Sequence, residues 1–154
     1  MSFELLHEKW GHEGGTKDYD VWIAEDTQSG RTLMIRRWGK VGTRGAFKKQ
    51  IFASARQAKA WIGKARQDKF GHGYFEQEKN TVLGASAVNE LHVVAREMKL
   101  AGTSLEFQEL AAIGLGAEAD SFLSGTPGPS ASQAAQSQTT VEQLDERPAL
   151  YGSW

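Results

Sequence analysis

The residues that could do chemistry in this chain are concentrated in one basic stretch. Between positions 36 and 69 the sequence contains eleven lysines and arginines and a single acid, Asp68. The whole chain has a formal net charge of −1, so its acids are concentrated in the flanking segments. Lysines and arginines gathered on one surface attract a nucleic acid, because they displace the counterions condensed along its phosphates. The alternative is a solvated charged face without a ligand, which is the common meaning of a charged run.

A tryptophan inside the basic stretch favours the binding interpretation. Trp38 alternates with Arg36 and Lys40, so a strand would place the three side chains on one face. Such a tryptophan could stack on an unpaired base between two phosphate contacts. It could equally be a core residue covered by a helix, because large aromatic side chains are usually buried.

Glycines follow the tryptophan at intervals of three, at positions 39, 42 and 45. This spacing does not suit a strand interior and predicts a bulge or a tight turn. The glycines could also let backbone N–H groups approach a phosphate, although the turn alone is the simpler explanation. We expect Arg44, Lys48 and Lys49 to contact a nucleic-acid backbone, because they lie in or beside this loop.

The elements that must position these residues form a small antiparallel sheet crossed by one helix, an α+β unit. Alternating apolar residues predict a hairpin of strands at 19–24 and 32–38, followed by a third strand at 48–52. Ser54 is a favoured helix N-cap, and an apolar stripe follows it at helical spacing: Ala58, Trp61, Ile62 and Ala65. The opposite side of this helix is basic, and we expect its side chains to project outward together: Arg56, Lys59 and Arg66.

The composition changes after residue 80, where alanine, leucine and acidic residues dominate. Apolar periodicity predicts helices at 86–100 and 103–113, with a last turn at 118–123. For the second helix the predicted caps are Thr103 or Ser104, with Glu106 or Gln108 in capping-box range. About forty residues seldom form a stable core alone. The segment 80–124 therefore either docks on the sheet or buries its apolar faces against another chain.

The last thirty positions divide into a linker and a short peptide. Residues 125–140 contain almost no large apolar side chain, so they predict a flexible linker. Apolar residues return in 141–154, which we interpret as a docking peptide for a protein partner, anchored by Leu150, Tyr151 and Trp154.

Several functional classes find no support in the sequence. The chain has no cysteine, no long apolar segment and no signal-peptide pattern, so we expect a cytoplasmic protein without membrane contact. His7 and His12 are five residues apart, a spacing that does not suit a metal site on one helical face. Asp18, Asp20 and the neighbouring acids fit the solvent side of a hairpin better than acid–base catalysis. We expect no metal, no cofactor and no enzymatic activity.

The order of these features resembles the WGR domain, a nucleic-acid-binding module. The resemblance is carried by the segment Arg37-Trp38-Gly39-Lys40-Val41-Gly42-Thr43-Arg44-Gly45, by the aromatic strand at 17–22, by the helix start at 54–58 and by the lysine, glycines and tyrosine of 69–74. Lys40 stands where the family has arginine. A lysine keeps the charge but loses the planar fork that binds phosphate or carboxylate through two hydrogen bonds.

The resemblance implies a WGR-like domain over 1–79 that binds DNA, with RNA as an alternative. In poly(ADP-ribose) polymerases this domain docks the enzyme on DNA breaks, whereas here the resemblance implies a stand-alone adaptor of bacteria or their mobile elements. The site residues expected for nucleic-acid contact are Arg36, Arg37, Trp38, Gly39, Lys40, Arg44, Lys48, Lys49, Arg56 and Tyr74. The rival hypothesis is a structural or assembly module, for example a phage component, which uses the basic face against an acidic protein and forms a homo-oligomer.

Overall fold

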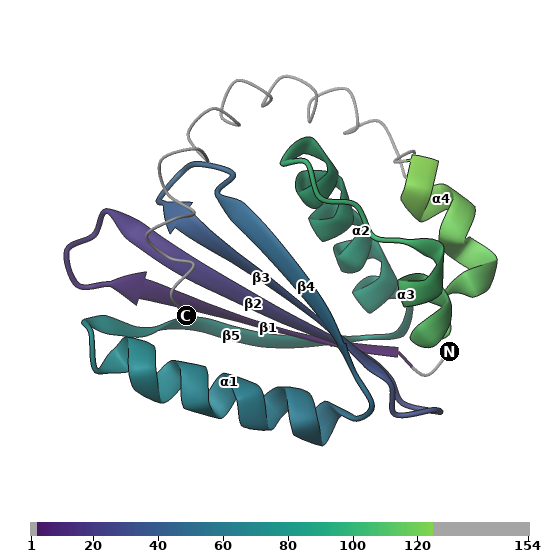
Figure 1. The fold of residues 1–154 in the computed structure, drawn as a ribbon, viewed down its shortest axis with the longest axis horizontal. Coiled ribbons are helices and arrows are strands. Elements are labelled where there is room, and N and C mark those ends of the chain that lie inside the picture. Colours follow the sequence, from purple (N-terminus) through teal and green to yellow (C-terminus); the bar gives the residue numbers. More distant parts are fainter. Residues whose placement is uncertain (1–2, 125–154) are drawn as a thin grey trace.

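The computed structural model describes residues 3–124 as a five-stranded antiparallel sheet with helices on both faces (Figure 1). The strands are β1 (Phe3–His12), β2 (Lys17–Asp26), β3 (Thr32–Lys40), β4 (Ala46–Phe52) and β5 (Tyr74–Leu83), in the sheet order β4-β3-β2-β1-β5. One face carries α1 (Ala55–Phe70), and the other carries α2 (Gly84–Leu100), α3 (Phe107–Ala112), the short 3-10 helix η1 (Gly116–Glu118) and α4 (Ala119–Ser124). The predicted α+β class is confirmed.

Three loops lie together at one end of the sheet. The register pairs Gly11 with Asp18, Trp38 with Ala46 and His12 with Tyr74 in antiparallel ladders. The loops at 13–16, 41–45 and 71–73 therefore meet at the same end, which we call the loop end (left in Figure 1).

Helix α1 begins and packs as its sequence predicts. The Ser54 hydroxyl accepts a hydrogen bond from the backbone N–H of Gln57 at 3.3 Å. Ala58, Ile62 and Ala65 are buried against the sheet, and Trp61 is half-buried beside them. The prediction of a basic side that projects outward is wrong in part, because Arg66 turns toward the sheet and forms an ion pair with Glu8.

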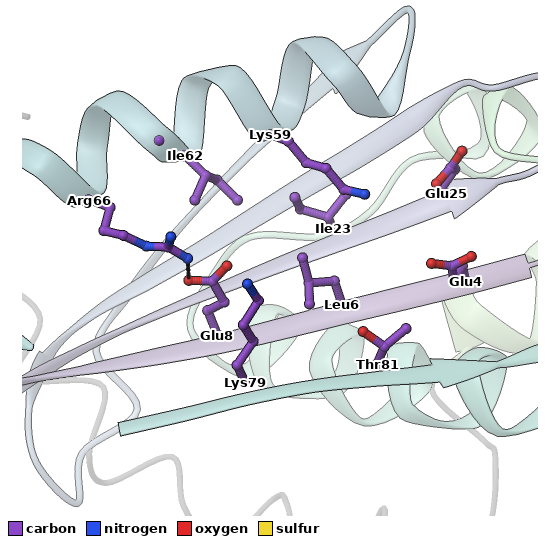
Figure 2. Close-up of a pocket in the computed structure, with 11 residues that line it drawn as sticks. Glu4, Leu6, Glu8, Ile23, Glu25, Lys59, Ile62, Arg66, Lys79 and Thr81 are labelled. Atoms are coloured by element: carbon purple, nitrogen blue, oxygen red, sulfur yellow. Dashed lines mark hydrogen bonds and ion pairs between the residues drawn. The ribbon is translucent and has the colours of Figure 1, made fainter. Parts of the chain in front are cut away.

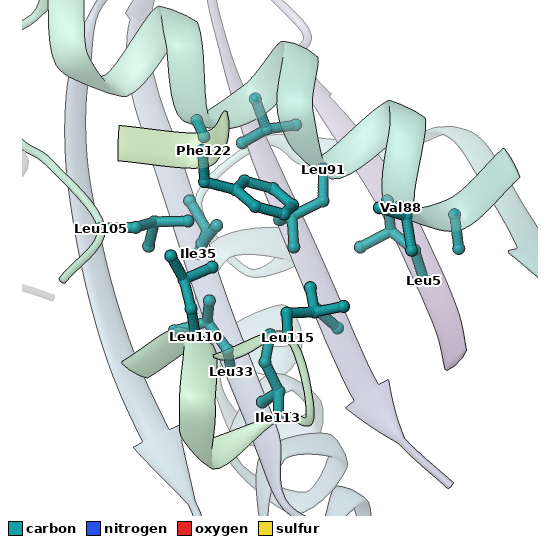
Figure 3. Packing of buried hydrophobic residues seen from close by; sticks show 14 of the residues in the cluster. Leu5, Leu33, Ile35, Val88, Leu91, Leu105, Leu110, Ile113, Leu115 and Phe122 are labelled. Atoms are coloured by element: carbon teal, nitrogen blue, oxygen red, sulfur yellow. The ribbon is translucent and has the colours of Figure 1, made fainter. Parts of the chain in front are cut away.

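The helices of the second half pack on the sheet face opposite α1, so the docking alternative of the sequence analysis is the one that the structure contains (Figure 3). Leu91 of α2 and Leu110 of α3 are fully buried, in a cluster that includes Leu5 of β1 and Ile35 of β3. Phe122 of α4 closes the same cluster. The sheet thus lies between two apolar layers, each covered by helix.

Three elements differ from the prediction. Strand β1 was not among the three predicted strands, although it pairs with both β2 and β5. Strand β5 was not predicted, although it pairs with β1 along its whole length. Helix α3 begins at Phe107 rather than at 103, because Glu106 is its N-cap and forms a reciprocal capping box with Glu109. The predicted caps Thr103 and Ser104 precede the helix in a segment without regular secondary structure.

The predicted linker at 125–140 and the docking residues Leu150, Tyr151 and Trp154 lie outside the described residues. Within the described part of the chain, no helix combines the length and apolarity needed to cross a membrane.

Candidate nucleic-acid interface

Trp38 lies in the core, which is the second of the two alternatives that the sequence left open. Its side chain is 6% exposed, on the sheet face covered by α1. Register places Trp10, Tyr19 and Trp38 in one row across β1, β2 and β3. Their rings stack with centroids 5.3 Å and 6.0 Å apart. Trp38 therefore anchors the segment that follows it, and its ring presents no open face for a base.

Arg36 is buried beside this aromatic row. Its guanidinium lies 4.5 Å from the centre of the Trp61 ring and 5.9 Å from that of Trp38. One N–H of the guanidinium donates to the Tyr19 hydroxyl at 3.3 Å. Burial raises the pKa of Tyr19, and the nearby Arg36 charge opposes that rise. The two tryptophans hold Arg36 by cation–π contact, so it adds positive potential without reaching solvent.

Arg37 points to the opposite face and shapes the turn at 41–45. It forms ion pairs with the carboxylates of Asp18 and Asp20. The same guanidinium donates to the backbone carbonyls of Lys40 at 3.1 Å, Thr43 at 2.8 Å and Arg44 at 3.0 Å. The buried Arg37 side chain thus holds the whole turn together. Its N–H groups already have partners inside the protein, so none is exposed to make the predicted contact with phosphate.

Gly39 and Gly45 are required by the backbone of the turn, which was the simpler explanation for these glycines. Gly45 has φ of +75°, a conformation that side chains rarely adopt. A Cβ atom at Gly45 would also clash with the carbonyl oxygen of Trp38 and lie 2.8 Å from Nε of Arg37. At Gly39 a Cβ atom would lie 3.0 Å from the Cα atom of Gly45. The turn is therefore packed around Arg37, with no room for a side chain at Gly39 or Gly45.

Arg44 and Lys49 are tied to the helices of the second half. The Arg44 side chain is 1% exposed, and its Nε lies 3.1 Å from a Glu97 oxygen of α2. Nζ of Lys49 lies 2.8 Å from a Glu109 oxygen and donates to the Ser104 carbonyl at 2.6 Å. These two cations, expected on the nucleic-acid surface, instead join the sheet to α2 and α3.

The remaining predicted cations stay exposed on the α1 side. Lys40 ends β3 at the loop end, Lys48 lies on β4 opposite Arg36, and Arg56 stands in the first turn of α1. Tyr74, the last predicted residue, is 5% exposed and contacts His12 edge-on, with ring centroids 4.9 Å apart. The ten predicted residues therefore divide into a buried framework and a smaller exposed set.

The structure gathers two further lysines at the loop end that were not predicted as site residues. Lys17 is the register partner of Lys40, so the two side chains leave the same face of adjacent strands. Lys69 arrives from the last turn of α1, and Nζ of Lys69 and of Lys17 lie 5.7 Å and 6.0 Å from the centre of the Tyr74 ring. We call Lys17, Lys40 and Lys69 the loop-end lysines. Correct pairing of the two strands would have been enough to find Lys17.

The pKa of Lys69 reflects its surroundings in this cluster. Burial lowers the pKa of Lys69 to about 8, with Asp68 raising it and Lys17 lowering it further. Like charges directly opposite each other on paired strands are unfavourable. A cluster of this kind favours an anionic ligand, because the ligand relieves the repulsion.

Comparison with known proteins identifies the domain. A family model described as the WGR domain matches residues 6–81. The chain is a WGR domain protein. The match covers the whole of β2, β3, β4 and α1, and all of β1 and β5 except the start of β1 and the end of β5. The loop-end lysines and the turn at 41–45 therefore all belong to the WGR domain. Searches of curated proteins and of solved structures give no match to the chain.

WGR domains are non-catalytic, nucleic-acid-binding modules of proteins related to poly(ADP-ribose) polymerases. Lys40, which the sequence analysis placed where the family has arginine, is exposed at the loop end. Within residues 3–124, no group of three or more histidine or acidic side chains is arranged to hold a metal ion. His7 bonds to Asp20 at 2.8 Å, and His12 bonds to the His72 carbonyl at 3.0 Å.

Proposed function

We propose that this protein is a non-enzymatic DNA-binding adaptor that contacts phosphates with its loop end. The observation that carries the proposal is the convergence of Lys17, Lys40 and Lys69 from a hairpin, a turn and a helix end. Affinity for the phosphate backbone depends mainly on a high local density of positive charge, whereas groups that contact bases add sequence specificity.

Lys48 and Arg56 extend the proposed surface along the α1 side. Both are exposed, and Lys48 leaves the same sheet face as the buried Arg36. A buried guanidinium adds to the potential over this face, since charges in a low-dielectric interior are less screened. The framework residues Arg37, Trp38 and Gly45 act indirectly, by fixing the turn that presents Lys40.

The helical side supports the adaptor role. Val93 of α2 is 49% exposed and Phe107 of α3 is 56% exposed, on elements whose inner faces are already packed on the sheet. Large apolar side chains on an outer surface are candidate anchors for a protein partner. We infer that nucleic acid and protein would occupy opposite sides of the sheet.

A binding panel tests the proposal. Intact, nicked and blunt duplex DNA, single-stranded DNA and duplex RNA are titrated with the protein across a salt series. We expect binding to DNA whose affinity falls steeply with salt, and a stronger signal for nicked or blunt DNA would indicate recognition of an end. A defined oligomer by light scattering, without affinity for any of these ligands, would instead favour the assembly module with an acidic protein partner.

A further inference from the structure

The loop end carries exposed apolar side chains that the proposed DNA contact does not use. Among the described residues, Val41 is 54% exposed in the turn at 41–45, and Phe75 is 47% exposed at the start of β5. The backbone N–H of Val41 donates to the Thr16 carbonyl at 3.0 Å, so this turn lies against the loop at 13–16. A nucleic-acid backbone is contacted through charge and hydrogen bonds. Lysines beside exposed apolar side chains therefore fit a second kind of ligand, a peptide that is both acidic and apolar.

The last residues of the same chain have this chemistry. All the charged residues after position 124 lie between positions 142 and 147, and they are three acids and one arginine. The acids are Glu142, Asp145 and Glu146. Large apolar residues occur among and after them: Val141, Leu144, Leu150, Tyr151 and Trp154. Segment 141–154 is thus complementary to the loop end in charge and in apolar character.

The tether between the described fold and this segment is long enough. Helix α4 ends at Ser124, toward the end of the sheet away from the loop end (Figure 1). The seventeen residues from 125 to 141 separate it from Glu142, and a chain of that length spans up to about 60 Å. Strand β1 has ten residues, which corresponds to about 34 Å. The tether can therefore pass along the whole sheet, and it holds the segment at an effective concentration on the order of millimolar.

A cavity of about 320 Å³ between α1 and strands β1, β2 and β5 is a weaker match for the segment (Figure 2). Its two ends each contain both signs of charge: Lys59 lies with Glu4 and Glu25 at one end, and Lys79 lies with Glu8 and Arg66 at the other. An acidic peptide would meet carboxylates at either end. The loop-end lysines do not line this cavity, so the two surfaces can be tested separately.

We propose that segment 141–154 docks on the loop end of its own domain. Its acids lie against the loop-end lysines, and its apolar residues cover Val41 and Phe75. The docked segment and DNA then exclude each other, because both use the same lysines. This exclusion rests on the proposed function, whereas docking itself can be measured without DNA.

A spin label tests the docking in the full chain. The chain has no cysteine, so Ser153→Cys provides a single attachment site for a nitroxide. We expect the nitroxide to broaden the backbone amide resonances of the loops at 13–16, 41–45 and 71–73 more than those of the turn at 27–31. Equal broadening at both ends of the sheet, or none at the loop end, would overturn the proposal.

A mixed sample distinguishes docking within one chain from docking between copies. In this sample the isotope-labelled chain carries no nitroxide, and the nitroxide is on an unlabelled chain. We expect its loop-end resonances to stay sharp. Broadening of the same size as in the doubly labelled chain would assign the contact to a second copy and overturn docking on the segment's own domain.

Matched charge variants test the contact itself. Asp145→Asn/Glu146→Gln removes two acids of the segment and should reduce the broadening at the loop end. The control Glu78→Gln/Asp120→Asn removes the same charge from exposed positions of β5 and α4, and it should keep the wild-type broadening. Equal broadening in the two variants would contradict recognition through these acids.

Addition of DNA separates this inference from the proposed function. DNA should remove the broadening, and Asp145→Asn/Glu146→Gln should bind DNA about two- to tenfold more tightly than the control, since exposed ion pairs are individually weak. Broadening that persists at saturating DNA would contradict the shared surface. Docking in a protein without affinity for DNA would contradict the proposed function and would still support the docking surface.

Discussion

Neighbouring residues of the same chemical type have different roles in this protein. Arg37 and Lys40 are three positions apart in one strand, yet Arg37 is 6% exposed and Lys40 is exposed at the loop end. The difference follows from strand alternation and from the acids at Asp18 and Asp20, which are the register neighbours of Gly39 and Arg37. The basic residues near the tryptophan therefore cannot be treated as one footprint.

Replacing Arg37 should destabilise the whole fold. The variant Arg37→Ala removes the buried cation shared by Asp18 and Asp20, which keep only Lys9 and His7 as partners, and removes the guanidinium donor from three backbone carbonyls of the turn. Breaking a buried pair from one side costs about 3–5 kcal/mol, and we expect a loss of that size in urea denaturation. The exposed Arg31→Ala should change stability by less than about 0.5 kcal/mol. Equal stability of the two variants would contradict the framework role of Arg37.

Lys69 should make stability depend on pH in the alkaline range. Its pKa is about 8 in the folded protein against an ordinary value of 10.5. Between these two pH values the unfolded chain binds more protons at this residue than the folded protein does. The free energy of unfolding therefore rises with pH across this range. We expect Lys69→Gln to be more stable than wild type at pH 7 and to lose that advantage by pH 10. Melting temperatures at both pH values check this, with the exposed Lys64→Gln as a control that should show no such change.

At the scale of elements, the sequence predicts those helices and strands whose apolar residues recur with the same spacing as their buried positions. Helix α1 and strands β2 and β3 have strong apolar patterns, and each occurs near its predicted bounds. Strand β5 was missed because its residues from Phe75 to Thr81 are all exposed and mostly polar, with types that are depleted in strands. Its strand conformation depends on pairing with β1, which no local pattern in β5 encodes.

The docking of α2 should contribute to the stability of the sheet itself. Leu91 is fully buried in the cluster shared with β1 and β3, whereas Val93 of the same helix is 49% exposed. Leu91→Ala should cost about 2–5 kcal/mol, and Val93→Ala should have little effect. Thermal unfolding of Leu91→Ala should remain one cooperative transition, because the sheet and α2 share a core. Two separate transitions would show that the helical segment folds independently.

At the scale of the whole molecule, the sheet separates two kinds of basic residue. Arg44 and Lys49 face α2 and α3 and are matched by Glu97 and Glu109. Lys17 and Lys69 lie near the Tyr74 ring on the α1 side, and Lys40 is the register partner of Lys17. The sequence predicts the basic composition of the domain but not this division, because the acids that pair with Arg44 and Lys49 lie more than fifty residues away along the chain.

The same limit applies to the candidate site. Lys40 could be predicted from its place after the tryptophan, and Lys69 from its place before the glycines that end α1. Their proximity to Lys17 depends on the three-dimensional register of β2 with β3 and on the direction of α1. Long-range pairing of this kind decides which cations share a surface.

The most direct test of the account is the salt dependence of DNA binding in matched triple variants. Fluorescence anisotropy compares wild type with Lys17→Gln/Lys40→Gln/Lys69→Gln and with the control Arg31→Gln/Lys64→Gln/Lys99→Gln, which removes the same charge from exposed positions elsewhere. The loop-end variant should bind more weakly, and its slope of log K against log salt should become shallower by about 0.9 for each phosphate that the protein no longer neutralises. The control should keep the wild-type slope. An equal reduction of affinity and slope in both variants would show that only net charge matters, and would contradict a phosphate-binding surface at the loop end.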